Sequence, residues 1–167
     1  MKIKFNNCKE FLDKLNTLVY AIVGLPLLLF SVVYLKQKDG KLPAILSSGE
    51  YLPYLTGLLV ALTLVFLVWG YVFYKKEMKA ARETQDLRTK LDKLAQATFK
   101  KFMLFFISLN LAVLGLLLTA EKYYSGLFVF VLIFISISNP SQHRILRDLR
   151  LNKEDGQKIL NKEEPIE

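Results

Sequence analysis

Residues 51–74 read YLPYLTGLLVALTLVFLVWGYVFY, a run of 24 residues that contains no Asp, Glu, Lys or Arg. An α-helix rises about 1.5 Å per residue, so about 20 apolar residues cross the roughly 30 Å hydrocarbon core of a bilayer. A soluble amphipathic helix would show a polar face, and this stretch has almost none. The segment therefore predicts a membrane-spanning helix.

Three further uncharged stretches lie on either side of this segment. The first, 15–35, has 21 residues, the second, 102–120, has 19, and the third, 123–143, has 21. The last span is expected to end at Asn139, because the following Pro140 breaks a helix. We therefore predict an all-α integral membrane protein with four transmembrane helices, at about 15–35, 52–74, 102–120 and 123–139.

The positive charges favour one orientation. Lys and Arg number 4 before the first span, 3 in residues 36–50, 9 in 75–101, 1 in 121–122 and 6 after the last span. An inside N-terminus gives the cytoplasmic side 19 of them and the outer side 4. Because cytoplasmic loops carry the excess of Lys and Arg, we predict both termini in the cytoplasm. The short loops and lysine-rich segments favour a bacterial inner (cytoplasmic) membrane.

Three parts follow from these spans. Residues 1–14 are an amphipathic cytoplasmic segment, residues 15–139 a four-helix membrane domain, and residues 140–167 a cytoplasmic tail. The loop of residues 75–101 has no Gly or Pro and consists of strong helix formers. It predicts a cytoplasmic helical extension between helices 2 and 3, broken near residues 81–84, with Thr84 as a cap and Asp86 in the first turn.

A narrow apolar stripe runs along this extension. Leu87, Leu91 and Leu94 follow a spacing of four and three, and Thr98 comes four residues later. That spacing is typical of a coiled-coil seam. Three alternatives are open for these leucines: packing within the chain, on a second copy, or on a partner protein. We interpret them as a partner-docking seam.

The tail begins with a basic helix. Asn139 can cap it and Pro140 can take its first position. Arg144, Arg147 and Arg150 then lie three residues apart on one face. They predict contact with the headgroups of anionic phospholipids, and a solvated basic face is the alternative.

Within the spans, few residues stand out as contact positions. Asn110 and Ser108 are the polar pair of the third span, and we expect them to form interhelical hydrogen bonds; a ligand for a transported substrate is the alternative. Gly57 and Ala61, four residues apart, predict close helix packing. Pro26 lies inside the first span and predicts a helix kink.

The sequence carries few groups for catalysis. Its single cysteine, Cys8, excludes an intrachain disulfide, and with the single histidine, His143, a Cys/His zinc site would need several carboxylates or a partner chain. No phosphate-binding glycine loop or nucleophile elbow occurs. The tail after the last span balances 6 basic against 6 acidic residues. We therefore expect no enzyme, no cofactor, no metal and no nucleic-acid partner.

Three functions are compatible with these observations. The first is a non-enzymatic small membrane subunit or scaffold that packs with partner membrane proteins, or with copies of itself, and docks through its basic cytoplasmic loop. The alternative is an oligomeric small pore or transporter, holin-like or of a defence type, suggested by Pro26 and Asn110. The third is a membrane lipid-modifying enzyme, for which Glu121, His143 and Asp148 are the candidates.

Overall fold

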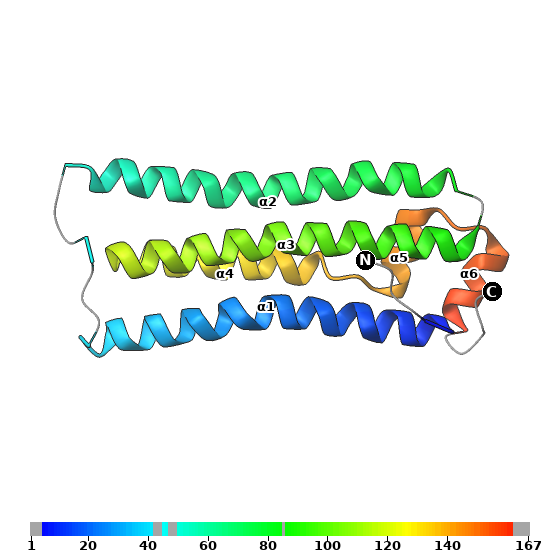
Figure 1. Cartoon of the computed structure of the whole chain (residues 1–167), viewed down its shortest axis with the longest axis horizontal. Coiled ribbons are helices and arrows are strands. Elements are labelled where there is room, and N and C mark those ends of the chain that lie inside the picture. Colours follow the sequence, from blue (N-terminus) through cyan, green and yellow to red (C-terminus); the bar gives the residue numbers. More distant parts are fainter. Residues whose placement is uncertain (1–4, 42–44, 47–49, 85, 162–167) are drawn as a thin grey trace. The chain divides into compact units, whose positions relative to one another are not determined.

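Every regular element in the described part of the chain is a helix. The computed structural model describes residues 5–41, 45–46, 50–84 and 86–161, so the ends of the predicted terminal segments, 1–4 and 162–167, lie outside it. The all-α prediction is confirmed (Figure 1). The helices are α1 (Cys8–Lys38), α2 (Leu52–Arg82), α3 (Leu87–Thr119), α4 (Tyr123–Ile137), α5 (Gln142–Leu149) and α6 (Lys153–Leu160).

Three helices are long and apolar enough to cross a membrane. These are α1, α2 and α3, with 31, 31 and 33 residues. Helix α4 has 15 residues, fewer than the roughly 20 that a span requires, and a fourth crossing results only if α4 and α5 together form one bent span. The chain is thus a multi-pass membrane protein, with three such helices, or up to four, among the residues that the structure describes. Helix α4 ends two residues before the predicted boundary at Asn139.

The chain divides into two compact units. Unit 1 comprises residues 1–20, 71–102 and 139–167, and unit 2 comprises residues 21–70 and 103–138. Each of α1, α2 and α3 contributes one part to each unit. This division differs from the three sequential parts expected from the sequence, because the long helices continue past the ends of their apolar stretches.

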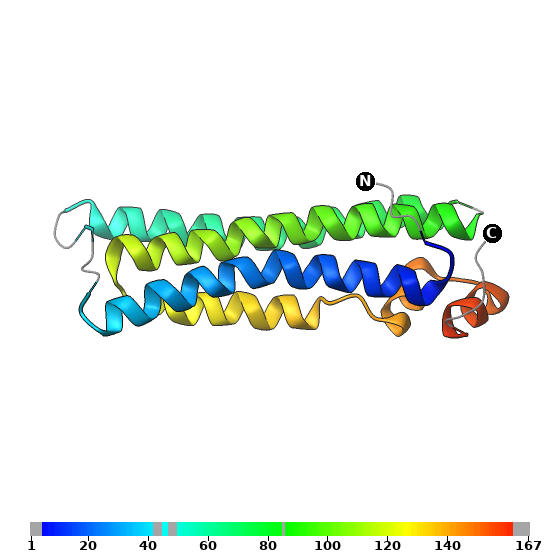
Figure 2. The same cartoon turned by 60° about the horizontal axis from the view of Figure 1, so that its bottom comes forward.

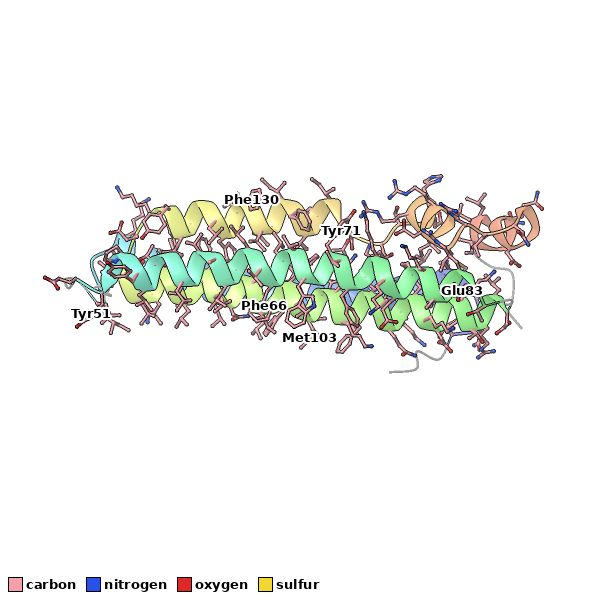
Figure 3. The ribbon with its side chains drawn as sticks, turned by 90° about the horizontal axis from the view of Figure 1, so that it is seen from above. Tyr51, Phe66, Tyr71, Glu83, Met103 and Phe130 are labelled. Carbon is pink, nitrogen blue, oxygen red and sulfur yellow. The ribbon has the colours of Figure 1, made fainter. Side chains whose placement is uncertain are left out.

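Unit 2 is a bundle made from parts of α1, α2 and α3 together with α4 (Figures 1 and 2). Its buried centre contains Tyr124, and the rings of Phe30 and Phe128 stack with their centroids 4.0 Å apart. Figure 3 shows Phe130 and Met103 pointing outward on opposite sides of this unit, and both are exposed. Apolar side chains cover its outer surface, as a lipid environment requires.

Unit 1 has its own apolar core around the first half of α3. Leu91, Leu94 and Ala97 are completely buried there. Side chains of the first turns of α1 pack into the same core, among them Phe11 and Leu15. The segment predicted as a separate amphipathic lead-in is therefore, from Cys8 onward, the beginning of α1, and its apolar face packs on protein.

Helices α2 and α3 are separated by a short break near the predicted position. Helix α2 ends at Arg82 and α3 begins at Leu87. Asp86 caps α3, because its Oδ2 accepts from the backbone N–H of Thr89 (2.8 Å) and from its hydroxyl (2.6 Å). The prediction of Thr84 as the cap was wrong: its hydroxyl accepts instead from Nζ of Lys93 (2.7 Å).

The cap of α5 also differs from the prediction. Ser141, not Asn139, is the N-cap, and its Oγ accepts from the backbone N–H of Arg144 (3.3 Å). Ser141 has the extended backbone that an N-cap needs, with φ −125° and ψ 160°. Pro140 therefore precedes the cap and does not occupy the first helical position.

Candidate functional site

Helix α5 is linked to α2 through one residue, Asp148. The hydroxyl of Tyr74 donates to Oδ2 of Asp148 (2.8 Å), and Nε of Arg82 donates to its backbone carbonyl (2.7 Å). Both donors lie on α2, about two helical turns apart. The last carbonyls of a helix have no partner within the helix, so Arg82 satisfies one of them in α5. Asp148 thus connects the side chain and the backbone of α5 to the same neighbouring helix.

A buried lysine lies beside this link. Lys101 of α3 is 3% exposed, and its Nζ lies 4.2 Å from the ring centroid of Tyr74 and 4.9 Å from that of Phe102. Burial, followed by the charge of Arg144, lowers the pKa of Lys101 from 10.5 to about 7, while Asp148 opposes the shift. Lys101 can therefore gain or lose a proton near neutral pH, which an exposed lysine cannot.

Two arginines of α5, Arg144 and Arg147, lie near this link. Nε of Arg147 lies 3.5 Å from Oδ1 of Asp148, and Arg144 is close enough to act on the charge of Lys101. Asp148 thus interacts with Arg82, Arg147 and Lys101, and Arg144 acts on the charge of Lys101. We call these five residues and Tyr74 the Asp148 cluster.

The three arginines predicted to contact lipid headgroups occupy different environments. Nη1 of Arg144 donates to the backbone carbonyl of Asn139 (3.4 Å), and this residue is half-buried. Arg147 pairs with Asp148, and its side chain is 72% exposed. Arg150 is the exposed C-cap of α5 with a left-handed backbone, φ 49°. Arg150 thus lies beyond the last helical residue of α5. Contact of the three arginines with lipid headgroups stays a prediction.

The predicted docking seam lies inside unit 1. Leu87 is 8% exposed, and Leu91 and Leu94 are completely buried. They belong to the core that also contains Phe11 of α1 and Met78 of α2. The seam therefore packs within the chain, as one of the three alternatives supposed, because the neighbouring helices of unit 1 cover the stripe. It offers no exposed surface for a partner.

Ser108 and Asn110 form different hydrogen bonds. The hydroxyl of Ser108 donates to the backbone carbonyl of Thr63 in α2 (2.9 Å), so it links two helices. Nδ2 of Asn110 donates to the carbonyl of Phe106, one turn earlier in α3 (2.8 Å). An interhelical contact of Asn110 therefore rests on the sequence alone.

The packing residues of the spans also differ in position. Gly57 and Ala61 are exposed on α2, and a Cβ added at Gly57 would meet nothing within 4 Å. At Gly115 of α3, by contrast, an added Cβ would overlap the ring of Tyr124. Pro26 is buried, and α1 continues through it as one helix. Gly115 is thus a glycine in close contact with a side chain inside unit 2, whereas Gly57 faces outward.

Sequence reasoning missed Lys101 and Tyr74, which it treated only as loop and span boundaries. One signal was available for Lys101. The spacing of four and three that runs through Leu91, Leu94 and Thr98 reaches Lys101 three residues later and Phe105 four after that. A lysine on the buried stripe of a helix requires compensation by its surroundings. No comparable signal identifies Tyr74 as the partner of Asp148.

The residues considered for catalysis do not form a metal site in the part of the chain that the structure describes. No three or more His, Cys, Asp or Glu side chains there could hold a metal ion. His143 is exposed, whereas the carboxylate of Asp148 accepts the Tyr74 hydrogen bond. Cys8 is completely buried in the unit 1 core.

The helices define the class to which the chain belongs, that of all-helical multi-pass membrane proteins. Comparison with protein-family models, with curated proteins and with solved structures finds no match.

Proposed function

We propose that the protein is a non-enzymatic membrane subunit or scaffold that crosses the bilayer four times. In this proposal α4 and the start of α5 form the bent fourth span, and both termini and residues 75–101 are cytoplasmic. The distribution of Lys and Arg supports this orientation, with 19 on the cytoplasmic side and 4 outside. The proposed location is a bacterial inner membrane, on the basis of the short loops and lysine-rich segments.

One observation supports a partner in the membrane. Gly57 and Ala61 lie one turn apart on an exposed face of α2, and the space around Gly57 is open. Small residues with this spacing allow two helix backbones to approach closely in lipid. The bundle of unit 2 does not use this face itself, so it is available to a helix of another chain.

A second, basic surface supports docking outside the membrane. Lys75, Lys76 and Lys79 are exposed on α2, and Nζ of Lys75 lies 4.7 Å from the ring centroid of Tyr71. Because the leucine seam is buried, these lysines replace it as the proposed docking residues of the loop. A partner with an acidic surface would be complementary to them.

The test is native mass spectrometry of the tagged protein after gentle extraction from its own membrane. We expect a defined heteromeric assembly, lost in Gly57→Ile because the branched side chain blocks the close approach. Gly126→Ile is the matched control: a Cβ at Gly126 also meets nothing within 4 Å, and residue 130, four positions on, is a phenylalanine. An unpartnered monomer would contradict the proposal. A homo-oligomer with ion flux that Asn110→Leu abolishes would instead establish the pore alternative.

A further inference from the structure

The end of unit 2 that carries the connection from α1 to α2 exposes two adjacent apolar residues, Ile45 and Leu46. Their side chains are 62% and 43% exposed. The backbone N–H of Leu46 donates to the carbonyl of Leu118 near the end of α3 (2.8 Å). The last carbonyls of a helix have no partner within that helix, so this bond attaches the two residues to the end of α3. Ile45 and Leu46 are thus held beside the bundle, while their side chains stay outside its core.

Three tyrosines are exposed at the same end of unit 2, where α2 and α4 begin (Figure 1). The exposed fractions are 83% for Tyr51, 79% for Tyr54 and 47% for Tyr123. The hydroxyl of Tyr123 donates to Oγ1 of Thr56 (3.2 Å), which links the first residue of α4 to α2. A tyrosine combines an apolar ring with a polar hydroxyl, and such residues are enriched where a membrane meets water. The three tyrosines therefore indicate that this end of unit 2 lies at the membrane–water interface.

The ends of the apolar stretches place Ile45 and Leu46 at the same depth. Leu118, which accepts the hydrogen bond from Leu46, lies two residues before the end of the uncharged residues 102–120. The ends of spanning segments lie where the hydrocarbon core meets the lipid headgroups. The outward surface of unit 2 is apolar along α4 as well, where Phe130 is 52% exposed and points outward (Figure 3). Ile45 and Leu46 therefore continue the lipid-facing surface of unit 2 to its end.

We propose that Ile45 and Leu46 insert into the glycerol region of the phospholipid bilayer and, with the three tyrosines, form an interfacial anchor. The anchor fixes the depth of this end of unit 2 in the membrane. Withdrawal into water would expose the apolar side chains, and deeper insertion would carry the charged Asp39 and Lys41, which pair at 3.6 Å, into the hydrocarbon. The occupant of this surface is lipid, so the anchor depends neither on a protein partner nor on the orientation of the chain in the membrane.

The test introduces a tryptophan at residue 45. The chain has a single tryptophan, Trp69, so Trp69→Phe provides a background without this fluorophore. In that background the full chain with Ile45→Trp is placed in phosphatidylcholine nanodiscs that carry bromine on the acyl chains, either near the glycerol or at the chain middle. We expect bromine near the glycerol to quench the fluorescence at least about twice as strongly as bromine at the chain middle, and iodide in the water to quench it little. Leu46→Trp should give the same order, which supplies a second variant if the first folds poorly.

Two control variants in the same background calibrate the result. Phe130→Trp, at an exposed residue in the middle of α4, should be quenched more by bromine at the chain middle. Asp39→Trp, in the same connection as Ile45 and with a side chain that is 57% exposed, should be quenched mainly by iodide. Equal quenching of Asp39→Trp and Ile45→Trp by bromine would show that tryptophan itself enters the interface, and it would overturn the proposal. Quenching of Ile45→Trp by iodide alone would place residue 45 in water, and protection from both quenchers would show that protein covers it; either result overturns the anchor.

Discussion

The ring of Tyr124 lies so close to the backbone of Gly115 that a Cβ at residue 115 would overlap three of its ring carbons. Tyr124 is completely buried and cannot swing away. We therefore expect Gly115→Ala to destabilise unit 2 by about 1 to 3 kcal/mol, the usual cost of overpacking a core. Thermal unfolding of the detergent-solubilised protein would measure the loss.

Gly126→Ala is the control for this variant. Gly126 lies in α4, and an added Cβ there meets nothing within 4 Å. Alanine stabilises a helix by about 1 kcal/mol relative to glycine. Gly126→Ala should therefore leave the stability unchanged or raise it slightly. Equal effects of the two substitutions would show that helix propensity, and not contact with Tyr124, decides the outcome at Gly115.

The buried seam of α3 predicts an effect on folding. Leu91 is completely buried in unit 1, so Leu91→Ala removes core contacts and should lower the stability by about 2 to 5 kcal/mol. Amide hydrogen exchange of residues 87–100 would report this loss directly. Leu160→Ala, at a leucine that is 49% exposed in the same unit, should change the exchange little. If Leu91→Ala releases a partner while exchange stays slow, the seam serves docking after all.

Lys101 predicts a dependence of stability on pH. The pKa of Lys101 is about 7 in the folded chain and 10.5 in an ordinary lysine. Between about pH 7 and 10.5 the unfolded chain therefore binds the proton more tightly than the folded chain. The stability of unit 1 should therefore rise with pH from about 7 to 10.5, and the full penalty, at most about 5 kcal/mol, applies below pH 7.

Substitution of Lys101 tests this penalty. Lys101→Met keeps a similar volume without the charge, and we expect it to raise the stability of unit 1 at pH 6 by about 1 to 4 kcal/mol. The gain should shrink as the pH approaches 10.5, and denaturation followed by hydrogen exchange at several pH values would measure it. Lys79→Met, at an exposed position, should show no such pH dependence. A gain that is constant with pH would contradict a buried charge at Lys101.

The sequence predicts the helices better than their contacts. A bilayer imposes a minimum length and an apolar composition on any helix that crosses it. The stretch around Leu67 therefore predicts a span without any knowledge of the neighbouring helices. Gly57 and Gly115, however, are both glycines in apolar helices, and only the three-dimensional packing shows that one touches a ring and the other faces outward. The same holds for Asp148, whose partner Tyr74 lies 74 residues away in the chain.

The polar residues of α3 give the next prediction. Ser108→Ala removes an interhelical hydrogen bond to Thr63, and such bonds contribute about 0.6 kcal/mol on average in membrane proteins. Ser136→Ala is the matched control, because its hydroxyl donates to the carbonyl of Leu132 within α4 (3.0 Å). Thermal unfolding should show a larger loss for the Ser108 variant. The reverse order would mean that the Ser108 bond adds nothing to helix association.

The last prediction concerns the attachment of α5 to α2. Tyr74→Phe removes the hydroxyl that donates to Asp148 and leaves a partly buried carboxylate with one hydrogen bond fewer. Hydrogen bonds to charged groups contribute about 1.5 to 3 kcal/mol, so amide exchange in α5 should accelerate at least about tenfold. Arg82→Met should act in the same direction, because it removes the hydrogen bond that Nε of Arg82 donates to the backbone carbonyl of Asp148. Tyr20→Phe, at a tyrosine that is 64% exposed, should leave the exchange of α5 unchanged. If Tyr74→Phe and Arg82→Met both exchange like the wild type, the apolar contacts of Ile145 and Leu149 alone hold α5, and Asp148 is not the link that the geometry indicates.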